Sequence, residues 1–418
     1  MRRIMRSFVS VASLALYAVF TPAPAQTGAA ADMILRPHDK DAVALTPDQQ
    51  AVLDKIAWHP EAVNVRVLKM PDAAHAERTL TGHEDRFAKV VLPFGEGKDI
   101  TLVRRRATDK TDGGFTWRGV VEETGEFATL MLWKDGHLSG HFGYNGRIFV
   151  INSLGGDIHT LAEMKQPPDH PHKIAAAAPS PEPTVPLLAD AERRALEAKE
   201  ITIDIMLLYT RNAASHFIQH PADLMPLVID DANETFKNSG LGNVTLRLVH
   251  SQAIDFNEQG ADHFSILYEM VDGLGPFKDV KKLRNEKRAD IVGLIIDDAN
   301  GCGLSTRVGA DSEDAFLVVH YTCAAITHSI AHEVGHILGA RHDRLVDAND
   351  SPFAFAHGYV NGTKWRDMMS YGQGCGGCPR IPFWSNPRIM YKGEPTGTAA
   401  TDNARVILEQ AERVSNFR

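Results

Sequence analysis

The segment from His332 to Asp343, HEVGHILGARHD, contains the residues whose types and spacing point most directly to chemistry. Because residues four apart lie on one face of a helix, His332 and His336 can direct both imidazoles at one metal ion. Gly339 can adopt the backbone conformation that ends a helix, so that the chain turns and His342 returns as a third ligand. Three protein nitrogens and one open position form a catalytic rather than a structural zinc site, which predicts one Zn²⁺ per chain.

Glu333 is placed beside these histidines to hold a water molecule rather than to bind the metal. Zinc would lower the pKa of that water to roughly 7. Glu333 would take a proton as the water attacks a polarised peptide carbonyl, and would pass it to the leaving amine. The motif thus predicts a zinc endopeptidase. Three alternatives stay open: histidines satisfied by hydrogen bonds in a core, a catalytically inactive metal-binding or adhesion protein, and a zinc amidase that acts on a non-peptide amide.

The first 25 residues have the pattern of an export signal. A basic start, an apolar run over residues 8–20 and the sequence Ala-Pro-Ala at residues 23–25 are typical of a signal peptide and its cleavage site. A buried N-terminal helix is the alternative. No second long apolar segment occurs, so we expect no membrane anchor and a protein secreted to the extracellular space or the periplasm.

The composition narrows the class of partner. The 418 residues are 44% hydrophobic, which is enough for one large core or two smaller ones. The formal net charge of −9 argues against nucleic acid as a main partner. Protein or peptide substrates are therefore the expected partners.

All four cysteines, Cys302, Cys323, Cys375 and Cys378, lie in the C-terminal half of the chain. In an exported protein an even number of cysteines favours disulfides. Cys375 and Cys378 have a spacing that also occurs in redox pairs and zinc knuckles, but no second C-x-x-C completes a knuckle. We predict a Cys302–Cys323 bridge around a loop and a strand before the zinc helix, and a Cys375–Cys378 bridge in a small Gly-rich loop.

Residues 26–165 contain short β-prone runs separated by tight turns. The dipeptides Asp135-Gly136 and Asn145-Gly146 are strong signals for two-residue hairpins. This region therefore predicts a small, mostly antiparallel β domain without evident chemistry of its own.

Residues 166–199 are rich in proline and alanine and predict an exposed linker and activation region. The dibasic pair Arg193-Arg194 makes it a site for proteolytic cleavage. His170 and His172 in the linker are expected to be solvated, with contact to a metal as the alternative.

Residues 200–418 alternate between strand and helix patterns. We expect buried strands at 201–210, 243–254, 290–297 and 315–322, helices at 215–238 and 278–287, and the zinc helix directly after the last strand. This order predicts an α/β (α+β) domain with a mixed sheet and a zinc-binding active-site helix. Several aspartates lack the spacing of a calcium loop and are expected to cap loops instead; they are Asp297, Asp298, Asp311 and Asp347.

The segment WRDMMSYG, from Trp365 to Gly372, carries a family resemblance. A zinc motif of this form followed by a methionine in M-S-Y resembles the metzincin clan of zinc endopeptidases. The resemblance implies that Met369 forms a methionine turn under the three histidines. It also implies that Tyr371 takes the place of a tyrosine that contacts the metal or the oxyanion in astacin- and serralysin-like members, with a buried hydroxyl supporting the turn as the alternative. Asp343 matches the adamalysin-like form.

The closer resemblance, over residues 200–418, is to secreted bacterial peptidyl-Asp metalloendopeptidases and their reprolysin-like relatives. Besides the zinc helix it rests on CPRIPFWSNP and the terminal ATDNARVILEQAERVSNF. The N-terminal region is loosely similar to the propeptides of such zymogens, which implies that the chain's own propeptide is an inhibitor. No cysteine precedes Cys302, so a carboxylate, a histidine or steric cover must block the zinc.

The same resemblance implies cleavage on the N-terminal side of aspartate. The pocket for the residue after the scissile bond should then hold a cation. In metzincins its wall comes from the methionine turn and the segment after it, which here contain Lys364, Arg366, Arg380 and Arg388. We expect Arg380 first, because the neighbouring cysteine bridge could fix its backbone, and Arg366 second. A solvated surface charge is the alternative for each of them.

Overall fold

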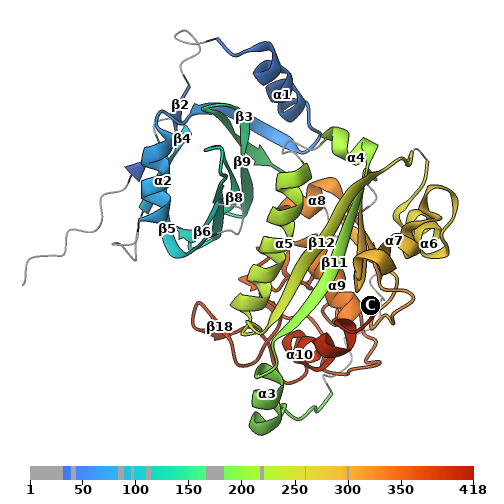
Figure 1. Ribbon diagram of the computed structural model, residues 1–418. Helices are drawn as coiled ribbons and strands as arrows, with labels where there is room; N and C mark the ends of the chain where they lie inside the picture. Colours follow the sequence, from blue (N-terminus) through green and yellow to red (C-terminus); the bar gives the residue numbers. More distant parts are fainter. Residues whose placement is uncertain are drawn as a thin grey trace, which may run out of the picture.

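The computed structural model describes residues 32–38, 44–82, 89–95, 98–109, 114–165, 183–216, 221–258, 260–298 and 301–418. Two separate large sheets divide them into an N-terminal domain, residues 32–165, and a C-terminal domain, residues 183–418 (Figure 1). The expected signal peptide and most of the linker, with His170 and His172, lie outside the described residues. Within these ranges no helix is long and apolar enough to cross a membrane.

The N-terminal domain is built on one ten-stranded sheet with the order β1-β4-β5-β6-β7-β8-β9-β10-β3-β2. Its described pairings are antiparallel apart from that of β1 with β4. The sheet curls until β2 lies against β4, around a core that includes Trp117 and Phe142 (Figure 1). The strands are β1 Asp32–Met33, β2 Arg36–Pro37, β3 Ala62–Lys69, β4 Lys89–Gly95, β5 Lys98–Asp109, β6 Phe115–Val121, β7 Phe127–Leu132, β8 Leu138–Tyr144, β9 Arg147–Gly155 and β10 Ile158–Met164.

Tight turns set the register of the central strands. Asn145 and Gly146 join β8 to β9 with φ angles of 53° and 73°. Two successive positive φ angles are what a two-residue hairpin of the primed type requires. Gly136, between β7 and β8, has a φ of 86°. The two-residue hairpin expected at Asn145-Gly146 is therefore confirmed. The one expected at Asp135-Gly136 is wrong, because these residues lie in a longer loop between Leu132 and Leu138 in which only Gly136 has a positive φ.

Two helices of the N-terminal domain were not expected from the sequence. The first, α1 (Pro47–Ala57), begins with a capping box in which the side chains of Thr46 and Gln49 each bond the other's backbone N–H. The second, α2 (Ala73–Thr81), begins at Asp72, whose carboxylate accepts from the His75 backbone N–H at 2.9 Å. Both capping patterns are visible in the sequence. Neither segment, however, has apolar residues repeating at helical spacing over a long enough stretch to predict a helix.

A buried histidine makes the stability of the N-terminal domain sensitive to acid. His159 on β10 accepts a hydrogen bond at its Nε2 from the Leu138 backbone N–H at 3.0 Å, and burial lowers its pKa from 6.5 to about 4. Between these values the unfolded chain binds more protons than the folded one. The contribution of His159 is therefore full above pH 6.5 and is lost as the pH falls towards 4. We expect unfolding by denaturant to show a loss of about 3 kcal/mol from pH 7 to pH 4.

The variant His159→Gln isolates this effect, because glutamine can donate and accept hydrogen bonds but does not titrate. Its stability should depend less steeply on pH in this window than that of the parent chain. The matched variant His75→Gln, whose imidazole lies on the surface helix α2, should keep the steep dependence. Equal slopes for the parent and His159→Gln would contradict the assignment.

The C-terminal domain contains the predicted mixed sheet. Its five strands have the order β12-β11-β13-β15-β14, and all pairings are parallel apart from that of β14 with β15. β14 lies at the edge and is the only short, antiparallel member of this sheet. The strands are β11 Ile201–Thr210, β12 Val244–Ile254, β13 Ile291–Ile296, β14 Gly303–Ser305 and β15 Phe316–His320.

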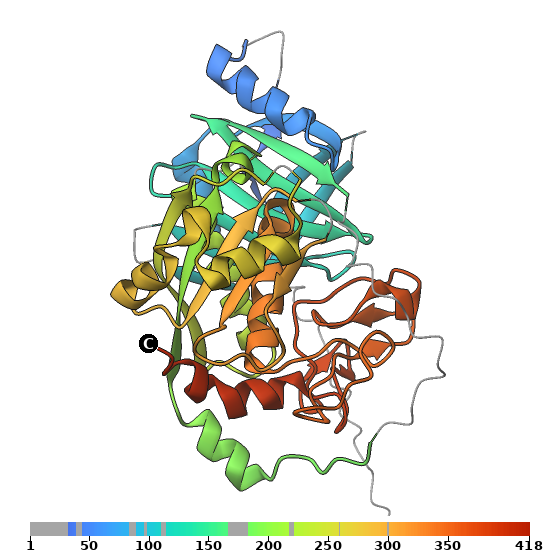
Figure 2. The ribbon, with the colours of Figure 1, turned by 90° about the vertical axis from the view of Figure 1, so that its right-hand side faces the viewer.

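Helices cover both faces of this sheet (Figures 1 and 2). Alternate residues of β11 point to opposite faces: Ile205 packs with α5, α9 and α10, and Met206 packs with α6, η1 and α7. The helices and remaining short elements are α3 Asp190–Glu197, α4 Arg211–His216, α5 Pro221–Asn238, α6 His263–Asp272, η1 Gly275–Phe277, α7 Val280–Lys287, α8 Tyr321–Ile326, α9 Ser329–Leu338, β16 Val360–Asn361, β17 Trp365–Arg366, η2 Gly372–Cys375, β18 Met390–Tyr391, β19 Glu394–Pro395 and α10 Asn403–Val414.

The expectation that the zinc helix directly follows the last strand is wrong. β15 ends at His320, and the short helix α8 intervenes before α9 begins at Ser329. The structure forms both predicted bridges, with S–S distances of 2.04 Å for Cys302–Cys323 and 2.01 Å for Cys375–Cys378. The first bridge ties α8 to the residue just before β14, so the intervening helix is part of the cross-linked segment.

Candidate metal centre

The helix α9 is buried along its whole length. It ends at Gly339, which has a φ of 114°, as expected from a glycine at this position. A Cβ on Gly339 would also lie 3.1 Å from side-chain atoms of Phe353 and Val406. Both the backbone conformation and the crowding therefore favour glycine, and the turn returns His342 to the side of the helix.

The imidazoles of His332, His336 and His342 converge. The Nε2 atom of His342 lies 3.1 Å from that of His332 and 3.0 Å from that of His336. The ligand atoms of these three histidines all lie within 4.8 Å of one another. Among the residues that the structure describes, this is the group of histidine, cysteine and carboxylate side chains that could hold a metal ion. The structure thus brings together all three predicted ligands.

Backbone carbonyls fix which imidazole nitrogens are free to bind a metal. The Nδ1 atom of His332 lies 2.9 Å from the Met368 carbonyl oxygen, and that of His336 lies 2.8 Å from the Ala340 carbonyl oxygen. A carbonyl only accepts, so both Nδ1 atoms carry the proton and both Nε2 atoms present lone pairs to the centre. Zn–N bonds of about 2.0–2.1 Å in a tetrahedron would hold these atoms about 3.3 Å apart. The donor set and its spacing therefore fit a tetrahedral zinc ion.

Glu333 follows the first ligand and is fully buried against β14. The Ser305 hydroxyl and backbone N–H donate hydrogen bonds to its carboxylate, yet burial dominates and raises its pKa to about 8. A Cβ on Gly303 would lie 2.7 Å from Oε1 of Glu333. Gly303 therefore leaves room for the carboxylate beside the edge strand.

Met369 lies beneath α9, where the resemblance expects the methionine turn. A Cβ on Gly335 would lie 3.3 Å from the Met369 sulfur and 2.4 Å from the Trp384 ring. Only a glycine lets the helix approach these two side chains so closely. Met369 and Trp384 are completely buried and form an apolar floor under the helix.

Two buried carboxylates hold the methionine turn in place. Asp343 accepts from the Tyr371 backbone N–H at 2.9 Å. Asp367 accepts from the Met369 backbone N–H at 3.1 Å and from the Ser385 backbone N–H at 3.0 Å, and burial raises its pKa to about 7. The sequence analysis did not identify Asp367, although an aspartate two residues before a turn residue is a recognised turn signal.

His357 is a second residue that the sequence analysis did not identify. It is fully buried, and its Nδ1 atom lies 3.0 Å from the carbonyl oxygen of His342. The Ser385 hydroxyl in turn donates to the His357 carbonyl at 2.7 Å. His357 therefore positions the backbone of the third ligand, and no local spacing links it to the zinc motif.

The Tyr371 ring lies beside the ligands. Its centroid is 4.5 Å from that of His342 and 6.5 Å from that of His332, and the side chain is buried. Tyr371 thus approaches the centre from the side of His342, next to the turn that its backbone N–H helps to fix.

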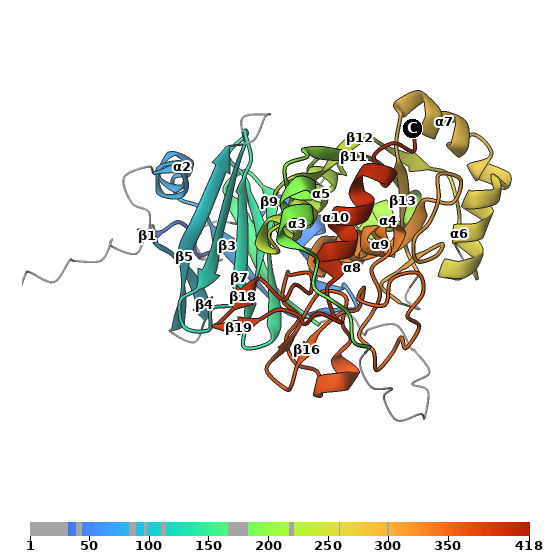
Figure 3. The same ribbon diagram turned by 90° about the horizontal axis from the view of Figure 1, so that it is seen from below.

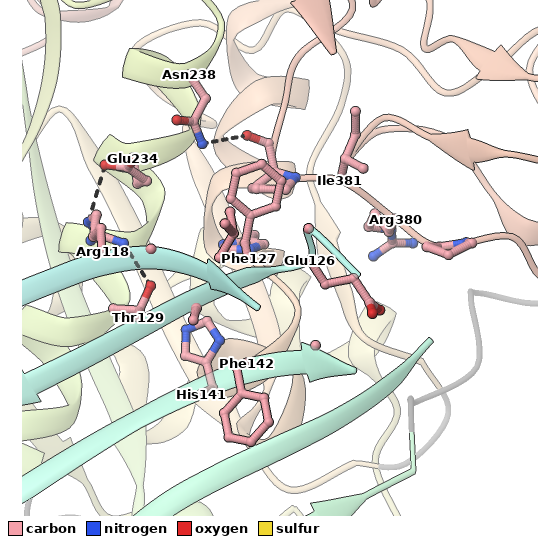
Figure 4. Close-up of a pocket in the computed structure, with 18 of the residues that line it drawn as sticks. Arg118, Glu126, Phe127, Thr129, His141, Phe142, Glu234, Asn238, Arg380 and Ile381 are labelled. Atoms are coloured by element: carbon pink, nitrogen blue, oxygen red, sulfur yellow. Dashed lines mark hydrogen bonds and ion pairs between the residues drawn. The ribbon is translucent and has the colours of Figure 1, made fainter. Parts of the chain in front are cut away.

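The two candidate pocket cations occupy different environments. Arg366 is buried, and its guanidinium donates to the backbone carbonyls of Ser370, at 3.1 Å, and Cys378. Arg380 is half-buried and lines a cavity of about 650 Å³ between the two domains (Figure 4). Arg366 therefore supports the backbone around the methionine turn, whereas Arg380 faces space in which a ligand could lie.

Three imidazoles that converge beside a buried carboxylate are the side-chain arrangement that metallohydrolases use. Residues 199–385 match the family model Reprolysin_5, metallo-peptidase family M12. A protein of Xanthomonas campestris pv. campestris named peptidyl-Asp metalloendopeptidase is 27% identical over 395 residues, 90% of this chain and 91% of that one. The site, the match over residues 199–385 and this relative thus define the class of the protein as a metalloendopeptidase.

Further similar proteins were found by sequence and by structure. A Stenotrophomonas maltophilia (strain K279a) protein with the same name is 29% identical over 400 residues, 89% of this chain and 90% of that one. The crystal structure of metalloproteinase-II from Bacteroides fragilis is 12% identical, with a TM-score of 0.42 over 74% of this chain and 90% of that one.

Proposed function

We propose that this protein is a secreted zinc endopeptidase of the metzincin type that is made as a zymogen. The observation that carries the proposal is the convergence of the Nε2 atoms of His332, His336 and His342 beside the carboxylate of Glu333. The relatives named peptidyl-Asp metalloendopeptidase support the same class of enzyme.

Glu333 is the general base of the proposed reaction. Zinc bound by the three histidines would polarise the peptide carbonyl and lower the pKa of a water molecule to about 7. The positive charge of a bound metal ion would lower the pKa of the buried Glu333 carboxyl again, so that Glu333 accepts a proton from the attacking water and transfers it to the amine that leaves. Ser305 holds the carboxylate in position, and we assign the Tyr371 hydroxyl to the negative charge that develops on the carbonyl oxygen.

The edge strand β14 is the proposed guide for the substrate backbone. It pairs with β15 on one side, and its residues Gly303 and Ser305 lie against Glu333. An extended peptide can add to such an edge through backbone hydrogen bonds. This arrangement would bring the scissile bond next to the general base.

Arg380 is the proposed determinant of a preference for aspartate after the scissile bond. The names of the relatives motivate this specificity. Arg380 lines the cavity together with Thr327 and His328, the residues just before α9. A guanidinium there can grip a carboxylate with two parallel hydrogen bonds. Arg366 is the weaker candidate because its guanidinium is engaged by backbone carbonyls.

The N-terminal domain is the proposed propeptide. It packs against the C-terminal domain beside the start of α9, and residues 166–199 connect the two. Cleavage within this connection would let the propeptide leave. The two bridges fit a protein that folds outside the reducing cytoplasm.

Purification of the active species tests the zymogen. We expect gelatin zymography to show one active band, with about one zinc per chain and an N-terminus between about Pro167 and Lys199, because exposed linkers are where nicking concentrates. Metal analysis and N-terminal sequencing of that band are the measurements. An active band that still begins near Gln26 would rule out the zymogen, and the absence of any gelatin-cleaving band from the processed protein would rule out the endopeptidase.

A further inference from the structure

An aromatic pair lies on the outer face of α6. Phe264 and Tyr268 are one helical turn apart, and their ring centroids lie 4.6 Å from each other. Phe264 is 62% exposed and Tyr268 is 37% exposed, whereas the inner face of the same helix is buried through His263, Ile266, Leu267 and Met270. Single exposed apolar residues need no explanation, but adjacent ones form a candidate contact surface.

Both ends of α6 are fixed, so the aromatic pair has a defined position. At the start of the helix, the Asp262 carboxylate accepts from the Ser265 backbone N–H at 2.8 Å. The His263 backbone N–H donates to the Asp298 carboxylate at 2.9 Å, and the His263 Nδ1 atom lies 2.6 Å from the same oxygen. At the other end, Gly273 closes the helix with a φ of 68°. The helix is therefore tied to the residues that follow β13.

Tyr268 connects the aromatic pair to the edge strand β14. Its hydroxyl donates to the Thr306 carbonyl at 3.3 Å, and Thr306 directly follows β14. The Thr306 backbone N–H donates to the Phe316 carbonyl of β15 at 3.2 Å, so the hydroxyl meets backbone that continues the pairing of the two strands. The helix α6 contacts both strands and lies on the opposite side of the sheet from α5 and α10 (Figure 3).

The side chains of β14 alternate between the two faces of the sheet. A Cβ on Gly303 would lie 2.7 Å from the Glu333 carboxylate, and the Ser305 hydroxyl donates to that carboxylate. Both positions therefore face α9. Leu304 between them packs instead with the cluster that contains Leu267 of α6. The helices α9 and α6 thus flank the edge strand from opposite faces.

A peptide that adds to β14 must follow the same alternation. Residues directly opposite each other on paired strands direct their side chains to the same face. A peptide residue opposite Gly303 or Ser305 therefore faces α9, and one opposite Leu304 faces α6. When the residue after the scissile bond enters a pocket on the α9 side, its two neighbours in the peptide face α6. These neighbours are the residue just before the scissile bond and the second residue after it.

We infer that Phe264 and Tyr268 form a specificity-determining subsite for an aromatic or large aliphatic side chain of the peptide substrate, one place from the residue that enters the pocket on the α9 side. The inference rests on the proposed function, because it needs the substrate to pair with β14. An incoming ring can pack edge-to-face or offset against the pair, and this contact removes exposed apolar surface from water. The hydrogen bond of the Tyr268 hydroxyl to Thr306 fixes the orientation of its ring.

Paired peptides test this subsite on the active enzyme, purified after expression of the full chain. Every peptide carries, after the scissile bond, the residue that the parent enzyme prefers there. The members of a pair differ at one position, which is phenylalanine in one and glutamine in the other. The variants Phe264→Gln and Tyr268→Gln remove one ring each and keep a good helix former. Leu274→Gln is the matched control, because Leu274 is 53% exposed but follows the far end of α6.

We expect the parent enzyme to favour phenylalanine over glutamine by about threefold to tenfold in kcat/KM at the residue just before the scissile bond or at the second residue after it. Phe264→Gln and Tyr268→Gln should each bring this ratio closer to one, while Leu274→Gln keeps the parental ratio. At the second residue before the scissile bond, which faces α9, the ratio should be the same in all four enzymes. Competition within each pair, followed by mass spectrometry of the products, gives the ratios.

Three results would overturn the inference. A parental ratio near one at both positions that face α6 would mean that the substrate does not meet the aromatic pair. A preference for phenylalanine that survives both Phe264→Gln and Tyr268→Gln would place the subsite elsewhere. The third result concerns the full chain, kept intact by Glu333→Gln, whose melting temperature should change by no more than about 1 °C on adding Phe264→Gln. A loss of several degrees would mean that another segment of this chain covers the pair.

The proposed function fails in a different way from the inference. If the purified enzyme hydrolyses none of the peptides, the proposed endopeptidase is wrong. If it hydrolyses them with ratios that do not depend on Phe264 and Tyr268, the endopeptidase stands and the subsite on α6 is wrong.

Discussion

Replacing Glu333 with glutamine is expected to lower peptide hydrolysis by about 10³-fold while zinc stays at about one per chain. Glutamine has the size of glutamate and can still accept from Ser305, but it cannot take a proton from water at neutral pH. The three imidazoles are untouched, so the metal affinity should be close to that of the parent. Turnover of a peptide and metal analysis on the same preparation are the measurements.

The variant His336→Ala is the complementary control for that prediction. It removes a ligand whose Nε2 atom lies 3.0 Å from that of His342, so metal and activity should be lost together. Activity that disappears in Glu333→Gln together with the metal would point to a structural role for the glutamate. Near-normal hydrolysis by a zinc-loaded Glu333→Gln would exclude it as the general base.

The metal centre could be predicted from the sequence because it is local. His332 and His336 lie on one helix. Gly339 ends that helix in a left-handed conformation, and the resulting turn brings His342 back towards the two histidines. The period of the helix and the left-handed glycine therefore fix the geometry without knowledge of the rest of the fold. The hairpin at Asn145 was predictable for the same reason, since its turn is specified by two adjacent residues.

Contacts between distant segments could not be predicted in this way. Arg118 and Asp230 are separated by 112 positions, and each alone has the sequence context of a surface charge. His357 reaches the backbone of His342 across a loop, so no fixed spacing marks it. The sequence analysis missed the helix α8, because a short apolar run directly after a strand has the same hydrophobic pattern as a continuation of that strand.

The two arginines show why residue type alone does not assign a specificity pocket. Arg366 and Arg380 are paired as neighbouring backbone segments, and the sequence presents both as cations after the methionine turn. The side chain of Arg366 enters the interior and bonds carbonyls, while that of Arg380 meets a cavity. Packing, rather than composition, separates a structural arginine from a candidate recognition residue.

Replacing Arg380 with alanine is therefore expected to abolish most of a preference for aspartate after the scissile bond. Loss of one partner from a desolvated ion pair costs roughly 2–5 kcal/mol, which corresponds to about 30-fold to several thousandfold in kcat/KM. The loss should be confined to peptides with aspartate at that position and should spare matched peptides with asparagine or leucine. Competition among the three peptides, followed by mass spectrometry of the products, gives the ratios directly.

Two further arginine variants make this result specific to the cavity. Arg388→Ala removes a cation that donates to the Leu188 carbonyl at 2.6 Å, and it should leave the ratio of aspartate to leucine cleavage unchanged. Arg366→Ala should lower stability, because two buried carbonyls lose their donor, with little change of that ratio in the folded fraction. A parent enzyme that prefers leucine would refute an acid-binding pocket altogether. A preference for aspartate that survives Arg380→Ala would instead place the recognising cation on another residue.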